Sequence, residues 1–146
     1  MLRFLSIVAA LAVAATAAYS QNLAAIKQRQ EAMKAVGAVA KEPGAMIKGE
    51  ASFELGKVQT ALKVYQEQAK KLPSLYPDDS KAGGDTAALP AVWEKKQEFI
   101  AGYEKLAKDA AAAVTTIKDE ASFKKEWPKV MDNCGACHKA FRRPKS

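Results

Sequence analysis

Both cysteines and the single histidine of this 146-residue chain lie in one pentapeptide, Cys134-Gly135-Ala136-Cys137-His138. On a helix, side chains at positions i, i+3 and i+4 share one face. Two thiols with this spacing can add across the two vinyl groups of a porphyrin, while the following imidazole binds the iron. This pattern is the attachment signature of c-type haem. The sequence therefore predicts one covalent haem c, bound through Cys134 and Cys137, with His138 as an iron ligand.

Three other interpretations of the pentapeptide are weaker. A thioredoxin-like redox pair belongs to a βαβ setting, and no strand-like alternation follows residue 20. A structural zinc site needs four ligands, whereas the chain has three Cys and His residues in total. A plain disulfide, common in small exported proteins, leaves the adjacent His138 unexplained.

The N-terminus has the pattern of a secretory signal peptide. A short basic start is followed by the apolar stretch 4–18, which is too short to span a bilayer, and then by small residues. We expect cleavage after Ser20, which divides the chain into a signal peptide (1–20) and one mature domain (21–146); cleavage after Ala17 is the second choice, and an uncleaved anchor the third. Since haem c is attached outside the cytoplasm, the protein is expected in the periplasm, without a membrane span.

Composition excludes several classes of function. The formal net charge of +7 is spread as lysine among acidic residues, without a dense basic tract, so nucleic acid is not an expected partner. The basic residues Lys139, Arg142 and Arg143 suit a helix C-terminus and could also steer a redox partner. The chain offers no second histidine for acid–base work and no nucleophile paired with a base, so we do not expect an enzyme.

Apolar spacing predicts an all-α protein with four helices. The clearest stripe is Leu55, Val58, Leu62, Tyr65, Ala69 and Leu72, which steps by three and four like the seam of a bundle helix. The last stripe contains both cysteines, so the haem is expected inside the bundle. The expected helices begin after Asn22, near Phe53, near Pro90 and before Phe123, with a loop at 74–89.

Two prolines complicate these boundaries. Pro43-Gly44 is expected to end or kink the first helix, although residues 45–48 could continue it. Pro128 predicts either a kink in the last helix or a separate haem helix that starts there.

The chain resembles the class II cytochromes c, which include cytochrome c′ and its low-spin, methionine-ligated relatives. Their CxxCH lies on the last helix of an antiparallel four-helix bundle, whereas class I proteins have it near the N-terminus. The matching stretches, in order, are Arg29–Lys34 (RQEAMK), Lys48–Glu50 (KGE), Leu72–Pro77 (LPSLYP), Leu89–Trp93 (LPAVW) and Cys137–Arg142 (CHKAFR).

The sixth position of the iron decides the function. His138 is the only histidine, which leaves a methionine, a lysine, water or nothing. Met1 leaves with the signal peptide, and Met131 lies seven residues before His138 on the same helix. Met33 and Met46 remain, and the resemblance places Met33 on the distal side of the haem.

The resemblance also implies two functions and two further site residues. A bound Met33 implies a one-electron carrier between periplasmic redox proteins, because a thioether ligand stabilises ferrous iron. A Met33 that only packs implies a five-coordinate protein that binds NO or CO. Arg29 is expected to pair with a haem propionate, and Arg142 to bind a propionate or tune His138. Class II proteins occur as monomers and as homodimers, and either is compatible with the sequence.

Overall fold

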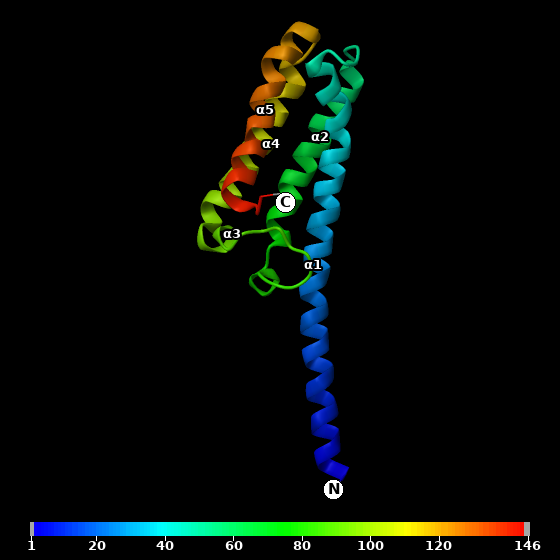
Figure 1. Cartoon of the computed structure of the whole chain (residues 1–146), viewed down its shortest axis with the longest axis vertical. Coiled ribbons are helices and arrows are strands. Elements are labelled where there is room, and N and C mark those ends of the chain that lie inside the picture. Colours follow the sequence, from blue (N-terminus) through cyan, green and yellow to red (C-terminus); the bar gives the residue numbers. More distant parts are fainter. Residues whose placement is uncertain (1, 145–146) are drawn as a thin grey trace.

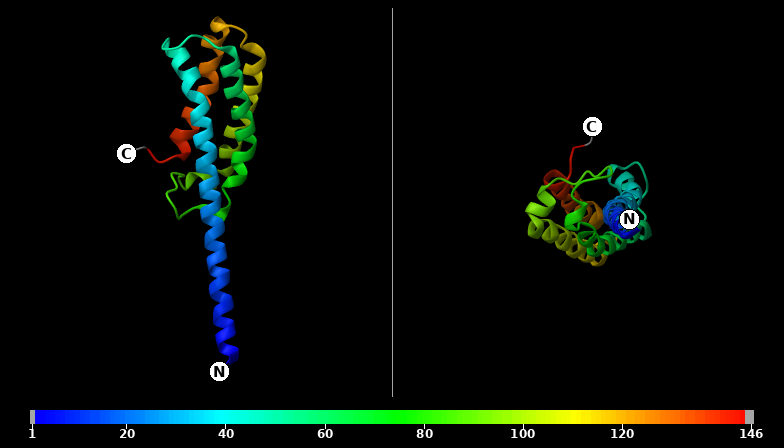
Figure 2. Two further views of the ribbon diagram at one scale, coloured as in Figure 1. Left: turned by 90° about the vertical axis from the view of Figure 1, so that its right-hand side faces the viewer. Right: turned by 90° about the horizontal axis from the view of Figure 1, so that it is seen from below.

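The computed structural model describes the backbone of residues 2–144 and the side chains of residues 23–144. Its long helices α1, α2, α4 and α5 lie side by side along the long axis of the molecule (Figures 1 and 2), as predicted. The bounds are α1 Leu2–Lys48, α2 Leu55–Lys71, α3 Ala91–Glu94, α4 Lys96–Thr116 and α5 Glu120–Phe141, with 3₁₀ turns at Leu72–Leu75 and Asp78–Ser80.

Helix α1 is much longer than its neighbours, and its first part extends beyond the bundle (Figure 2). The predicted signal peptide, residues 1–20, falls on this part, where side chains lie outside the described residues. Its cleavage therefore stays a prediction. Among residues 23–144, no helix is long and apolar enough to cross a membrane.

Of the alternatives for Pro43-Gly44, an end of the first helix is wrong, and the alternative that residues 45–48 continue it is confirmed, because α1 runs to Lys48. Proline costs an interior helix about 3 kcal/mol, but Pro43 is fully buried and Met46, one turn later, is 4% exposed. Burial of this last turn offsets the lost hydrogen bond. The helix ends where Gly49 adopts φ +77°, with Gly49 N–H donating to the Met46 carbonyl and Glu50 N–H to the Ala45 carbonyl, a Schellman motif.

Helix α5 begins at a capping box and passes through Pro128 without ending. The Asp119 side chain accepts a hydrogen bond from Ser122 N–H at 2.8 Å, and the Ser122 hydroxyl accepts one from Asp119 N–H. Trp127 and Val130, on either side of the proline, are both 2% exposed. Their packing holds the helix together, so a separate haem helix starting at Pro128 is excluded.

The third predicted helix is divided in two. The short helix α3 ends at Glu94, and Lys95 leaves helical geometry with φ −116° and ψ 44° before α4 begins. The indole N–H of Trp93 donates to the Tyr76 and Pro77 carbonyls, at 3.1 and 3.2 Å. Since these contacts hold α3 against the preceding loop, α3 takes a direction different from α4.

The interior consists of two apolar clusters. The Trp127 cluster fills the middle and far end of the bundle, and the Phe99 cluster lies where the α2–α3 loop closes the other end. The first contains Met46, Val58, Ala61, Leu62, Tyr65, Ala110, Ala113, Ile117, Phe123, Trp127 and Val130; the second contains Ala32, Ala69, Leu72, Leu75, Val92, Phe99, Tyr103 and Phe141.

Candidate haem-attachment site

The CxxCH pentapeptide, residues 134–138, lies near the C-terminal end of α5, as predicted. No disulfide joins Cys134 and Cys137, and both residues are half-buried. Burial raises the pKa of both thiols, and for Cys137 the neighbouring Cys134 raises it further. Before haem attachment, both sulfurs are therefore protonated at neutral pH. They lie one turn apart on one helix, which is the spacing that addition to the two vinyl groups of a porphyrin requires.

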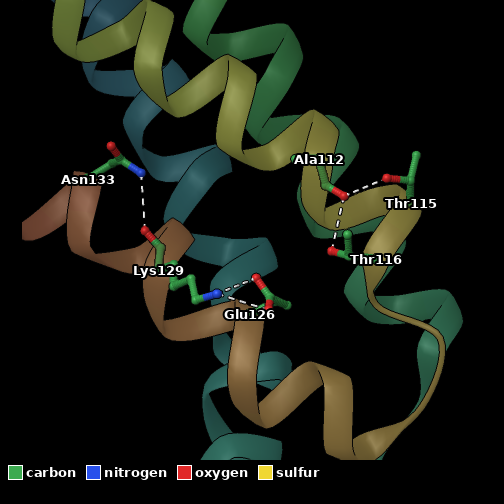
Figure 3. A network of polar contacts seen from close by, with 6 residues as sticks. All are labelled: Ala112, Thr115, Thr116, Glu126, Lys129 and Asn133. Atoms are coloured by element: carbon green, nitrogen blue, oxygen red, sulfur yellow. Dashed lines mark hydrogen bonds and ion pairs between the residues drawn. The ribbon is translucent and has the colours of Figure 1, made fainter.

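Helix α4 supports the turn that precedes Cys134. The Asn133 side-chain amide donates to Asp109 Oδ2 on α4 at 2.8 Å, and also to the Lys129 and Val130 carbonyls of its own helix. Figure 3 shows the bond to the Lys129 carbonyl beside the exposed Lys129–Glu126 ion pair. Lys105 on the same helix as Asp109 donates to the same carboxylate oxygen. Hydrogen bonds from Asn133 and Lys105 keep the pKa of Asp109 below its usual value.

His138 lines a surface hollow of about 480 Å³ together with Gly135, Lys139, Arg142 and Pro144. Within this group, Arg142 carries a buried Nε that has no hydrogen-bond partner among residues 23–144. A buried N–H without an acceptor is costly, and a carboxylate is the acceptor that a guanidinium binds best. The two thiols can bind the vinyl groups of a haem, and the imidazole can bind its iron. The N–H of Arg142 without an acceptor fits a haem propionate.

The structure separates the three described methionines. Met33 packs against the Phe99 cluster, and so does Cys137. Met46 is buried in the Trp127 cluster, and Met131 packs against that same cluster, where the Tyr65 hydroxyl donates to its sulfur at 3.9 Å. Among the methionines of residues 23–144, Met33 alone shares a cluster with a haem-attachment cysteine.

Three tyrosines, Tyr65, Tyr76 and Tyr103, lie close to the cysteines, and of these the sequence analysis placed Tyr65 on a core stripe. Tyr103 and Tyr76 both lie near Cys137, and Tyr65 lies near Cys134. Burial raises the pKa of all three hydroxyls, so they stay neutral. Helical spacing predicted that Tyr65 lies on the core face, but nothing in the sequence indicated which core residues adjoin the cysteines.

Arg29 is 4% exposed, and its guanidinium points into the α2–α3 loop. Nη1 donates to the Leu75 carbonyl at 3.3 Å and to Ser80 Oγ at 2.9 Å. Nη2 donates to the Ser80 carbonyl at 3.1 Å and to Thr86 Oγ1 at 2.6 Å. Burial lowers the pKa of Arg29. The loop thus occupies all four terminal N–H groups of the side chain that the sequence analysis assigned to a propionate.

Fold and site together define a class of protein: a four-helix bundle with CxxCH on its last helix is a class II c-type cytochrome. The family model described as cytochrome c′ matches residues 24–142. The chain belongs to this cytochrome c′ family, and it carries covalently bound haem c, as predicted.

Two relatives from Rhodopseudomonas palustris represent the two branches of the family. The chain is 50% identical over 121 residues to a cytochrome c′, covering 83% of each chain, and 32% identical over 146 residues to a cytochrome c-556, covering 97% of each. The solved structure of cytochrome c′ from this organism superposes with a TM-score of 0.82 at 49% identity, over 84% of this chain and 98% of the other. An NMR-validated model of oxidised R. palustris cytochrome c556 gives 0.78 at 30% identity, over 84% and 98%.

Proposed function

We propose that this protein carries single electrons through its haem, with His138 and Met33 as the two axial ligands. The observation that carries the proposal is the shared packing of Met33 and Cys137 against the Phe99 cluster. Met46 and Met131 pack in the other cluster, so Met33 is the methionine available to the attachment site.

Each residue has a separate part in this proposal. Cys134 and Cys137 hold the haem through thioether bonds, and His138 binds its iron. The haem supplies a one-electron couple, and the soft thioether of Met33 favours the ferrous state. The apolar side chains of the Phe99 cluster exclude water from the site, which limits ligand exchange.

Arg142 is the residue that we assign to the negatively charged propionates of the haem. Arg142 lines the hollow that His138 also lines, and its buried Nε has no partner among residues 23–144, so its guanidinium can donate to a propionate or act on the imidazole. The expectation that Arg29 binds a propionate remains a prediction; its four observed hydrogen bonds use Nη1 and Nη2 and leave Nε as the atom to test.

The second candidate function is binding of NO or CO by a five-coordinate iron, with Met33 only packing beside it. The observation that favours it is the higher identity to the relative named cytochrome c′, 50% against 32% for the cytochrome c-556 of the same organism. We assign no catalytic activity to the site, and we propose that the protein acts in the periplasm after removal of residues 1–20, with other redox proteins as its partners.

Optical spectra of the reduced protein separate the two functions. We expect a low-spin ferrous spectrum that Met33→Ala converts to a high-spin one. Met46→Ala is the matched control, since it shortens a methionine of the Trp127 cluster, and it should leave the spectrum low-spin. A wild-type protein that is already high-spin would reject methionine ligation in favour of gas binding.

A further inference from the structure

The connection between α2 and α3 touches both helices that bear the proposed axial ligands. Its residues 75–89, here called the strap, run from the 3₁₀ turn that follows α2 to the start of α3. Figure 1 shows this segment crossing the end of the bundle between α1 and the C-terminal end of α5. Met33 lies on α1 and His138 on α5.

The first attachment of the strap is to α1, one turn before Met33. Arg29 donates its four hydrogen bonds to Leu75, Ser80 and Thr86 of the strap. Its guanidinium carbon also lies 4.6 Å from the ring centroid of Tyr76, within cation–π range. The neighbouring Gln30 adds a bond from its side-chain amide to the Asp85 carbonyl at 2.8 Å.

The second attachment is to the end of the haem helix. Leu89 N–H donates to the Phe141 carbonyl at 2.9 Å, and Arg143 N–H donates to the Ala87 carbonyl at 2.8 Å. Ala88 and Arg142 form an antiparallel bridge between these two bonds. The backbone of the strap therefore pairs with residues three to five positions beyond His138.

One hydroxyl group connects the two attachments. Thr86 Oγ1 accepts the 2.6 Å bond from Arg29 Nη2 and a 3.2 Å bond from the backbone N–H of Ala88. A continuous series of contacts thus runs from Arg29 on α1 through Thr86 and Ala88 to Arg142, the residue that follows α5. None of the ion pairs formed by residues 23–144 includes Arg29, so neutral oxygens of the strap are what hold this buried cation.

We propose that the strap fixes the spacing between the α1 turn that bears Met33 and the α5 turn that bears His138, and thereby sets how firmly Met33 holds the sixth position. Arg29 and Thr86 are positioning residues in this arrangement. The inference rests on the proposed ligation by Met33. A loosened strap lets α1 move relative to α5, and Met33 then leaves the iron more often.

Carbon monoxide binding to the reduced protein measures this effect, because CO must replace Met33. Thr86→Val keeps the β-branched shape but removes the acceptor, so CO should bind roughly tenfold faster than to wild type, the effect of losing one hydrogen bond to a charged group. Thr116→Val is the matched control, since that hydroxyl donates only to Ala112 within α4 (Figure 3). It should leave the rate unchanged. Arg29→Lys keeps the positive charge but removes the guanidinium group with its four hydrogen bonds, so it should also increase the rate of CO binding.

The Met33→Ala background separates the possible failures. If the strap acts through Met33, Thr86→Val adds nothing to the fast CO binding of Met33→Ala. The same acceleration in both backgrounds would overturn the inference, because the strap would then control access to the iron. An unchanged rate in Thr86→Val beside a fast Met33→Ala would also overturn it while preserving methionine ligation. An unchanged rate in Met33→Ala would instead reject the proposed ligation.

Hydrogen exchange gives a readout that does not depend on the iron. Thr86→Val should increase exchange at the backbone amides of Ala88, Leu89 and Arg143, while Thr116→Val should not. Unchanged protection of all three amides in Thr86→Val would show that the hydroxyl does not join the two attachments, and would contradict the inference.

Discussion

Asn133 Nδ2 lies 2.8 Å from Asp109 Oδ2, and this contact ties the turn before Cys134 to α4. Asp109 also accepts from Lys105, and these two partners hold the pKa of Asp109 below its usual value of 3.8. A carboxylate whose pKa is lowered by folding stabilises the native state at pH values above its unfolded pKa. That contribution is lost as the pH falls through the lower, folded pKa.

Asp109→Asn should therefore reduce the free energy of unfolding by about 1 kcal/mol at pH 7, the size of one partly exposed charged hydrogen bond. The difference from wild type should stay constant down to about pH 5 and shrink below the ordinary carboxyl pKa of about 3.9. Denaturant unfolding across this pH range measures it. Asp132→Asn is the control, an exposed carboxylate on α5; a difference for Asp109→Asn that persists unchanged to pH 2 would contradict the assignment.

Removal of either thiol tests covalent attachment. Each single variant, Cys134→Ala or Cys137→Ala, should keep one thioether bond, whereas the double variant should keep none and should therefore lose its haem on denaturation in acidified solvent. Absorbance of the denatured chain after separation from free haem gives the bound fraction. Haem that stays on the denatured chain of the double variant would refute attachment through these residues.

Arg142 should influence the reduction potential. A cation near the haem disfavours the oxidised iron, so Arg142→Gln should lower the potential, by roughly 20–60 mV, a few-fold to tenfold in a one-electron equilibrium constant. Redox titration measures this change. The control Lys139→Gln removes the exposed cation of the same hollow, whose effect solvent should screen. Equal shifts in the two variants would argue against a special position for Arg142.

The predicted helices were most accurate where a stripe of apolar residues decides burial. Val58, Leu62 and Tyr65 of α2 are buried as their spacing indicates, and so are Phe123 and Trp127 of α5. In these helices the core lies along one face, so a period of 3.6 residues is sufficient to predict which side chains are buried. The CxxCH turn was found in the same way, because its chemistry is local in sequence.

Helix α1 was harder to predict because a distant segment covers it. Leu23, an apolar residue at the start of the first predicted helix, is 39% exposed, whereas Arg29 is buried by residues 46–57 positions later in the chain. The spacing of apolar residues within a helix does not indicate that a distant loop will cover it. The same holds for Pro43 and for the break at Lys95, where tertiary packing and the contacts of Trp93 override the local signals.

The most direct test of the account is the proton NMR spectrum of the reduced protein, labelled with ¹³C at the methionine methyl groups. A methyl group on a sulfur bound to low-spin ferrous iron lies over the porphyrin ring, whose ring current moves its signal far upfield. We predict one such signal, present in Met46→Leu and absent in Met33→Leu. Methionine methyl signals that all lie in their ordinary range would contradict the proposed axial ligation.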